Sequence, residues 1–247
     1  MTVKTNNNEV IRRLQQKILR WQGVKPATAH TTRMGLGPVE NSFPNGVFPI
    51  AGIHEFVCGI PEHAAATYGF VGSLLARLMQ DNGICLWIST ANTVSPTALK
   101  AFGVVPERVI FIDMKHEKGV LWAAEEALKH QGIAVVVAEL DRLDFVQSRR
   151  LQLAVEKSQA TGLILRRSPV QAGSTACVAR WQISPIPSMP EPGMPGIGMP
   201  RWQVKLLKVR NGQPGSWILE WRAGQFAAIN QTETQTEEMI RPHRKLG

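Results

Sequence analysis

The sequence has few cysteines, no long apolar run and a shortage of acidic residues, and each shortage excludes a class of protein. Its three cysteines, Cys58, Cys85 and Cys177, lie far apart among apolar or small residues. That pattern is typical of buried thiols and not of a disulfide or metal set. No apolar run approaches the roughly 20 residues that a membrane-spanning helix needs, and the start, MTVKTNNNEV, has no hydrophobic signal segment. We therefore expect a cytoplasmic protein without membrane association.

Basic residues outnumber acidic ones. The chain has 28 Lys and Arg against 19 Asp and Glu, a formal charge of +9 and a pI near 9.9. The excess is concentrated between Arg142 and Arg222, where 12 Lys or Arg accompany four Asp or Glu. Such an excess favours anionic partners, nucleic acid first; a solvated basic face is the alternative. The 247 residues are enough for one sizeable domain with appendages.

The stretch from Pro49 to Arg77 has the layout of a phosphate-binding P-loop. An apolar run at 50–57 predicts a strand, a loop with Gly and Pro follows, and apolar residues at helical spacing predict a helix over 64–79. A working P-loop, G-x-x-x-x-G-K-[ST], wraps backbone N–H groups around phosphates. Its Lys and hydroxyl supply charge and hold magnesium.

The residues that perform this chemistry are largely missing here. In the segment GIPEHAAAT, Gly59 and Thr67 are retained, but Ala65 stands where the second Gly belongs and Ala66 where the Lys belongs. We therefore expect the frame of a nucleotide site without its chemistry. No residues elsewhere have the spacing of a metal site, and we expect no metal and no cofactor.

Downstream, apolar strands alternate with helices, which predicts a parallel sheet covered on both faces. Strands are predicted at 84–89, 109–112, 133–138 and 162–165, and helices at 96–102, 118–130 and 145–159. From Thr175 the pattern changes to strands alone, at 175–184, 201–210 and 216–222, which predicts an antiparallel extension of the sheet. The residues from 227 onward are polar and predicted to be disordered.

An amphipathic helix is predicted near the N-terminus. Its apolar stripe consists of Val10, Leu14, Ile18 and Trp21, and a linker rich in Gly, Pro and Thr follows at 23–33. Such a helix docks either on its own core or on another chain, and docking on a second copy would give a homo-oligomer. The sequence thus divides into an assembly segment at 1–33, a core at 34–226 and a tail at 227–247.

This order of elements resembles the RecA-like core, and four segments carry a more specific resemblance. They are GLGPVENSFPNGVFPIAGIHEF, ALKAFGVVPERVIFID, TACVARWQISP and RWQVKLLKVRNGQPGSWILEW. Over about residues 9 to 226 the chain resembles the ImuA family, RecA-related accessory proteins of bacterial damage-induced mutagenesis. The implied fold is an α/β RecA-like core, with a mostly parallel twisted sheet, helices on both faces and antiparallel strands at the C-terminal end.

The resemblance also implies a function. It implies an SOS-type role in error-prone translesion DNA synthesis, beside ImuB, a partner similar to a Y-family polymerase, and beside an error-prone DNA polymerase. RecA and DNA are further candidate partners. The alternative is a SulA-type cell-division inhibitor on the same degenerate fold. An active ATPase is disfavoured by Ala65, Ala66 and Ala91, so we expect no enzymatic activity.

The RecA-like resemblance assigns further positions. The water-activating acid falls on Ala91, within STANT, and the magnesium-associated acid falls on Glu139, after VVVA. A Lys-x-Lys/Arg signature that reaches a neighbour's nucleotide in RecA-like proteins is matched by Lys208 and Arg210. Cations retained without a nucleotide to serve indicate another anion, either DNA or an acidic partner surface.

Basic residues near the predicted strand ends are candidates for DNA contact without sequence preference. They are Arg166, Arg167, Lys205, Lys208 and Arg210. Tryptophans alternate with cations on the terminal strands, which is compatible with base stacking or with burial in the core. These tryptophans are Trp181, Trp202, Trp217 and Trp221.

Overall fold

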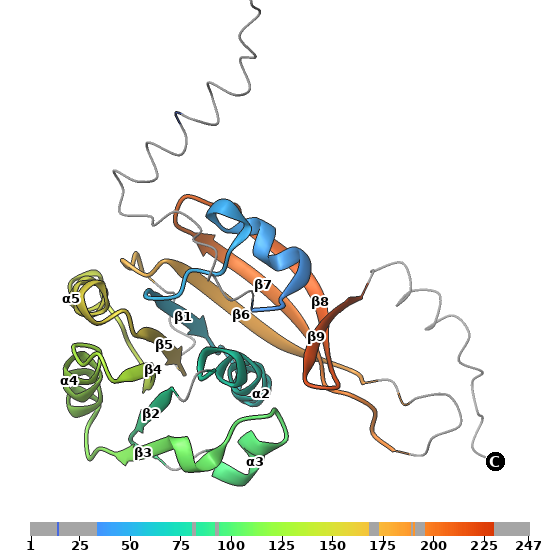
Figure 1. Cartoon of the computed structure of the whole chain (residues 1–247), viewed down its shortest axis with the longest axis horizontal. Helices are drawn as coiled ribbons and strands as arrows, with labels where there is room; N and C mark the ends of the chain where they lie inside the picture. Colours follow the sequence, from blue (N-terminus) through green and yellow to red (C-terminus); the bar gives the residue numbers. More distant parts are fainter. Residues whose placement is uncertain are drawn as a thin grey trace, which may run out of the picture.

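The computed structural model describes Leu14 and residues 34–80, 83–91, 94–167, 173–188, 190 and 196–229. The described residues form one nine-stranded sheet in the order β3-β2-β4-β5-β1-β6-β7-β8-β9 (Figure 1). Its strands are β1 (Ile53–Val57), β2 (Ile84–Ser89), β3 (Val109–Asp113), β4 (Ile133–Leu140), β5 (Thr161–Arg166), β6 (Ala179–Ile186), β7 (Arg201–Val209), β8 (Gly215–Arg222) and β9 (Gln225–Ile229).

The first six strands are parallel and the last three run antiparallel to their neighbours. The central strands β4 and β5 are buried along most of their length because helices cover both faces of this part of the sheet. The helices are α2 (Pro61–Leu78), α3 (Pro96–Lys100), α4 (Glu117–Ala127) and α5 (Phe145–Ser158), with short 3₁₀ turns η1 (Gly37–Ser42), η2 (Pro44–Gly46) and η3 (Pro106–Arg108).

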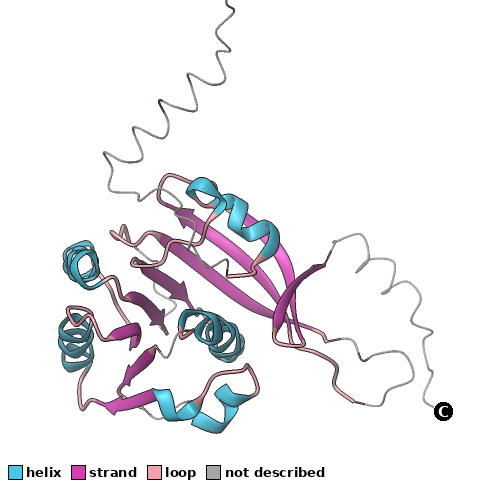
Figure 2. Ribbon diagram, in the orientation of Figure 1, coloured by secondary structure: helices cyan, strands magenta, loops and turns pink. Residues whose placement is uncertain are grey.

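Two apolar layers hold these elements together. On one face, α2 and the turns η1 and η2 pack against the sheet around Trp87 and Trp181, and this layer continues under β6 to β9. On the opposite face, α4 and α5 pack against β1, β2, β4 and β5 through residues such as Val120 and Leu151 (Figures 1 and 2). The expected α/β architecture, with an antiparallel C-terminal end, is confirmed.

Some predicted boundaries were wrong. Helix α2 begins at Pro61, three residues before the predicted start, because Pro at the first helical position and an acid in the first turn favour a helix start there. At the C-terminal end, residues 227–229 belong to β9, whose Ile229 pairs with Ile218. The ordered core therefore extends beyond the predicted boundary at 226.

The predicted assembly stripe lies outside the described residues, apart from Leu14, which is exposed. The tail from residue 230 onward also lies outside them. Among the described residues, no helix combines the length and the apolar character that crossing a membrane requires.

Candidate functional site

The loop between β1 and α2 is too short to wrap a phosphate. Only Cys58, Gly59 and Ile60 connect the two elements, and the helix starts at Pro61. The N–H of Ala64 already bonds the carbonyl of Ile60 at 3.2 Å, as in an ordinary first turn. A Cβ added to Gly59 would meet open space. The short loop therefore forms no wrapped nest of N–H groups, and only the first-turn N–H groups of α2 lie at the helix N-terminus.

The retained threonine is buried. The Thr67 hydroxyl donates to the carbonyl of His63 at 2.7 Å, and the Cys58 thiol contacts the same hydroxyl at 3.4 Å. Ala66 is buried one residue earlier, and Ala65 is exposed on the helix. None of these side chains presents a polar group to a ligand at the helix N-terminus.

Glu139 is the acid that the RecA-like resemblance assigns to magnesium, and here protein side chains surround it. It is fully buried on β4. The Trp87 indole donates to its Oε1 at 2.8 Å, and the Tyr68 hydroxyl donates to its Oε2 at 3.0 Å. An Arg167 guanidinium nitrogen lies 3.8 Å from the same Oε2. Both carboxylate oxygens thus have donors, which is how a buried charge is stabilised.

Arg167 links three strands at the carboxyl edge of the sheet, where parallel α/β proteins place their ligands. Its guanidinium lies near Glu139 on β4, donates to the Thr90 hydroxyl after β2 at 3.3 Å, and approaches Asp141, just after β4, at 3.5 Å. Nearby, the Ser89 hydroxyl donates to the carbonyl of Ala91, the predicted position of the missing water-activating acid. The edge is therefore occupied by contacts within the chain.

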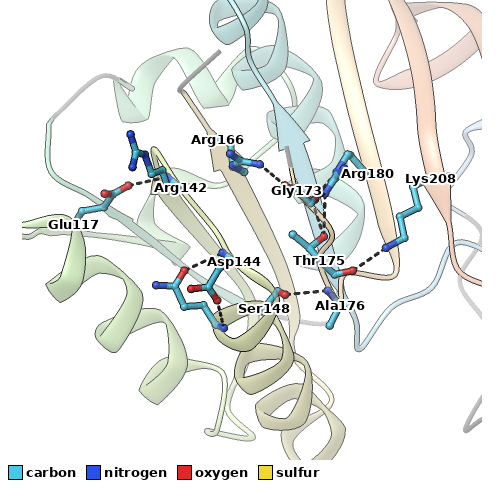
Figure 3. Close-up of polar contacts among 12 residues, drawn as sticks. Glu117, Arg142, Asp144, Ser148, Arg166, Gly173, Thr175, Ala176, Arg180 and Lys208 are labelled. Carbon is cyan, nitrogen blue, oxygen red and sulfur yellow. Dashed lines mark hydrogen bonds and ion pairs between the residues drawn. The ribbon is translucent and has the colours of Figure 1, made fainter. Parts of the chain in front are cut away.

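A second buried charge network lies on the α5 side of the sheet (Figure 3). Glu55, on β1, is fully buried, and its Oε1 accepts from Arg166 at 2.9 Å. Its Oε2 accepts from Arg180 at 2.9 Å and from the Thr175 hydroxyl at 2.8 Å. Arg166 is only 3% exposed. This placement argues against the predicted DNA contact of Arg166, because a buried guanidinium bound to a carboxylate does not reach a phosphate.

Hydrogen bonds hold the segment before β6, at Thr175 and Ala176, next to this network. Lys208 donates to the carbonyl of Thr175 at 2.7 Å, and Arg210 donates to the carbonyl of Ala176. The Ser148 hydroxyl, on α5, accepts from the backbone N–H of Ala176 at 2.9 Å (Figure 3). Lys208 and Arg210 therefore stabilise the chain through backbone carbonyls and form no salt bridge with a described carboxylate.

The structure brings Lys208, Arg210 and the exposed Lys205 together along β7 and its end, and it places Arg167 separately at the carboxyl edge. The tryptophans of the terminal strands belong to the apolar layer. Trp181, Trp202 and Trp221 are at most 5% exposed, and Trp217 packs against the same layer. Base stacking on the three buried rings is therefore excluded in this conformation.

Sequence reasoning missed Glu55, Tyr68, Trp87, Thr175 and Arg180. A glutamate inside the otherwise apolar strand IHEFV was one signal, because a buried carboxylate requires a cationic or hydrogen-bonding partner. Its partners come from other strands and from the segment before β6, and no sequence spacing connects them.

The cysteines are free and buried, as expected. Burial raises the pKa of the Cys177 thiol to about 12, which keeps it protonated and unreactive. Among the residues that the structure describes, no three His, Cys, Asp or Glu side chains gather as metal ligands would.

Comparison with known proteins identifies the family. No family model matches the chain. Two curated proteins named Protein ImuA, from Caulobacter vibrioides strains NA1000 / CB15N and ATCC 19089 / CIP 103742 / CB 15, are each 36% identical to it over 194 residues. The match covers 74% of this chain and 80% of each relative. Similarity of this extent supports a role in damage-induced mutagenesis, and the chain belongs to the ImuA family.

Proposed function

We propose that this chain is a non-catalytic accessory protein of the SOS-type response that supports error-prone translesion DNA synthesis. It acts beside an ImuB-like homologue of Y-family polymerases and an error-prone DNA polymerase, and it binds DNA. RecA is a further candidate partner. Membership of the ImuA family supports the setting, and the geometry of the former nucleotide site supports the absence of catalysis.

The observation that carries this proposal is the occupation of Glu139 by Trp87 and Tyr68. A magnesium ion bound to Glu139 would have to displace buried donors that already satisfy both oxygens. The phosphates would also lack the Lys contact, a charge-assisted bond worth about 1.5 to 3 kcal/mol. Because α2 begins at Pro61, which has no N–H, directly after a three-residue loop, the backbone offers no wrapped cradle in place of the P-loop.

DNA binding is supported by basic residues without a described carboxylate partner. Lys205, Lys208 and Arg210 lie along one strand and its end, and none of them forms a salt bridge within the described residues. The Arg167 charge is partly neutralised by Glu139 and Asp141, so Arg167 attracts DNA less strongly than an unpaired arginine would. Arg166 is not included in this surface.

The proposal is tested in cells of the source bacterium that lack the gene. We expect such cells to lose damage-induced mutation and to regain it with the wild-type chain. We also expect recovery with Thr67→Val, which removes the hydroxyl that a nucleotide site would need. Loss of mutagenesis with a folded Thr67→Val protein would indicate nucleotide chemistry and contradict the proposal.

The partners are tested by purifying a tagged chain from damaged cells. The expected result is enrichment of the Y-family-like homologue and the error-prone polymerase, and the same experiment reports RecA. A SulA-type inhibitor would instead block cell division when overproduced. Filamentation with unchanged mutation frequency would favour that alternative.

A further inference from the structure

Strands β6 to β9 have one covered face and one open face. On β7, Trp202, Val204 and Leu206 are buried against the layer that contains α2, whereas the intervening side chains point the other way. We call this second side the open face; it includes Gln182, Arg201, Gln203, Lys205, Glu220 and Arg222. Cross-strand pairing places Gln182 beside Lys205 and Arg201 beside Glu220.

No described helix covers the open face. Helices α4 and α5 lie on the same side of the sheet, but they pack against β1, β2, β4 and β5 (Figure 2). A sheet face with an apolar surface would need such a cover. This face is polar instead: Ile218, at its centre, is only 8% exposed, and the Gln203 amide donates to the Ser216 hydroxyl at 2.7 Å.

The charge on the open face is positive and incompletely compensated. Lys205 is exposed, and no described carboxylate pairs with it. Arg201 and Arg222 both bind Glu220, at 2.6 and 3.0 Å. Glu220 is only 4% exposed although it points to the open side. Two guanidinium groups thus converge on one carboxylate, an arrangement that also suits a phosphate. The Arg222 side chain is 55% exposed and that of Arg201 is 12% exposed, so Arg222 is the more accessible of the two.

We propose that the open face binds the phosphate backbone of a nucleic acid strand, a proposal that rests on the accessory function inferred above and locates its DNA contact. Arg201 and Lys205 are four residues apart on one strand, about 14 Å at 3.4 Å per residue. Neighbouring amide and hydroxyl groups, Gln182, Gln203 and Ser216, are further phosphate partners.

The chemistry of the face favours this ligand over a protein. The core of a protein interface is enriched in exposed aromatic and apolar anchors. The described side chains of the open face include no aromatic residue, and Ile218 is almost fully covered; Leu207, near the end of β7, is an exposed apolar side chain at the margin of the face. With no exposed ring to stack bases, recognition is confined to the backbone and is independent of sequence. Glu220 opposes binding by competing with phosphate for Arg201 and Arg222.

The proposal is tested with the full chain and a fluorescently labelled oligothymidylate, by anisotropy over a range of salt concentrations. Lys205→Gln breaks no described contact, and it should weaken binding about fivefold near 0.1 M salt. The triple change R201Q/K205Q/R222Q should weaken binding about 100-fold and reduce the slope of log K against log salt by about 2. Glu220→Gln should tighten binding about fivefold, because it removes the opposing charge.

A matched control is K118Q/R149Q/K157Q, which removes the same charge from exposed positions on α4 and α5. If the control weakens binding as much as the open-face triple, the effect is one of net charge and the proposal is wrong. If Lys205→Gln and Glu220→Gln both leave affinity unchanged in folded protein, the proposal is also wrong, even when the triple variant unfolds.

Failure of the open-face proposal can be distinguished from failure of the proposed accessory role. A wild-type chain that binds no oligothymidylate but restores mutagenesis overturns the open-face proposal and the proposed DNA binding, and leaves the accessory role in mutagenesis intact. Loss of binding to an acidic protein, with DNA binding retained in the open-face variants, would assign the surface to a protein and also overturn it. Nucleotide chemistry in the chain would contradict the accessory function while leaving the open-face result intact.

Discussion

The Trp87 indole donates a 2.8 Å hydrogen bond to the carboxylate of Glu139, inside the layer between the sheet and α2. In a nucleotide-binding protein of this architecture, the corresponding edge holds a metal and phosphates. Here the acid is part of the folded core. Glu139 accepts hydrogen bonds from buried side chains, so changing it should affect the stability of the fold.

We predict that Glu139→Ala destabilises the fold by about 3 to 5 kcal/mol, because it leaves the Trp87 and Tyr68 donors and the Arg167 charge without their buried partner. Glu139→Gln retains an acceptor and should cost less. Urea unfolding followed by fluorescence measures both. Equal, small losses for the two variants would show that Glu139 has no structural role.

The Glu55 network is predicted to be strongly coupled. Glu55→Leu alone leaves Arg166 and Arg180 without their carboxylate partner, beside an apolar residue. We expect it to lower the free energy of unfolding by about 3 to 5 kcal/mol. Adding Arg166→Met should recover part of that loss, because the buried charge is removed with its partner. A double-mutant cycle with additive costs would contradict the coupling.

His54 is predicted to make stability depend on pH. It is buried against Phe48, its Nε2 lies 2.8 Å from the Pro49 carbonyl, and its Nδ1 accepts from the Trp181 indole at 3.2 Å. Burial lowers its pKa to about 4. The folded state favours the neutral imidazole. His54 therefore makes its full contribution to the free energy of unfolding above about pH 6.5, and this contribution falls by about 3 kcal/mol as the pH falls towards 4.

The check is urea unfolding of the wild type and His54→Gln across that range. The difference in unfolding free energy between the two should shrink as pH falls, since glutamine does not titrate. A difference that stays constant from pH 7 to pH 4 would show that His54 is not held neutral.

Removal of residues 1–24 is predicted to leave a folded core, because the described core begins at Met34. If the stripe of Val10, Leu14, Ile18 and Trp21 serves assembly, the truncated chain should lose oligomeric mass in light scattering or fail to co-purify with its partner. An unchanged melting transition is the expected control result. If the truncated chain unfolds, the helix packs on its own core. If it folds and assembles as the full chain does, the helix has no docking role.

Much of the fold was predictable because its signals are local. Continuous apolar runs such as IAVVVA predict strands buried on both faces, and β4 occupies that position in the sheet. The start of α2 is also encoded, in the Pro61-Glu62 pair, but the P-loop frame predicts a loop over the same residues. The result was a predicted loop where the chain is helical.

The terminal strands show why the site was harder to predict. In Arg180-Trp181, Arg201-Trp202 and Trp221-Arg222, adjacent residues point to opposite faces of a strand. The alternation of aromatics and cations along the sequence is compatible with one shared platform, but period two separates them. The rings enter the core and the cations lie on the opposite side of the sheet, where Arg180 is held by buried Glu55. Networks such as that of Glu55 join residues more than 100 positions apart, which no local pattern predicts.

The central claim, that the former nucleotide site is a structural part of the core, is tested most directly by calorimetric titration of the full chain with ATP and magnesium. We expect no binding heat beyond dilution at micromolar protein, and no phosphate release above background. Saturable binding in the micromolar range or tighter, lost on changing Thr67 or Glu139 in variants that remain folded, would contradict it.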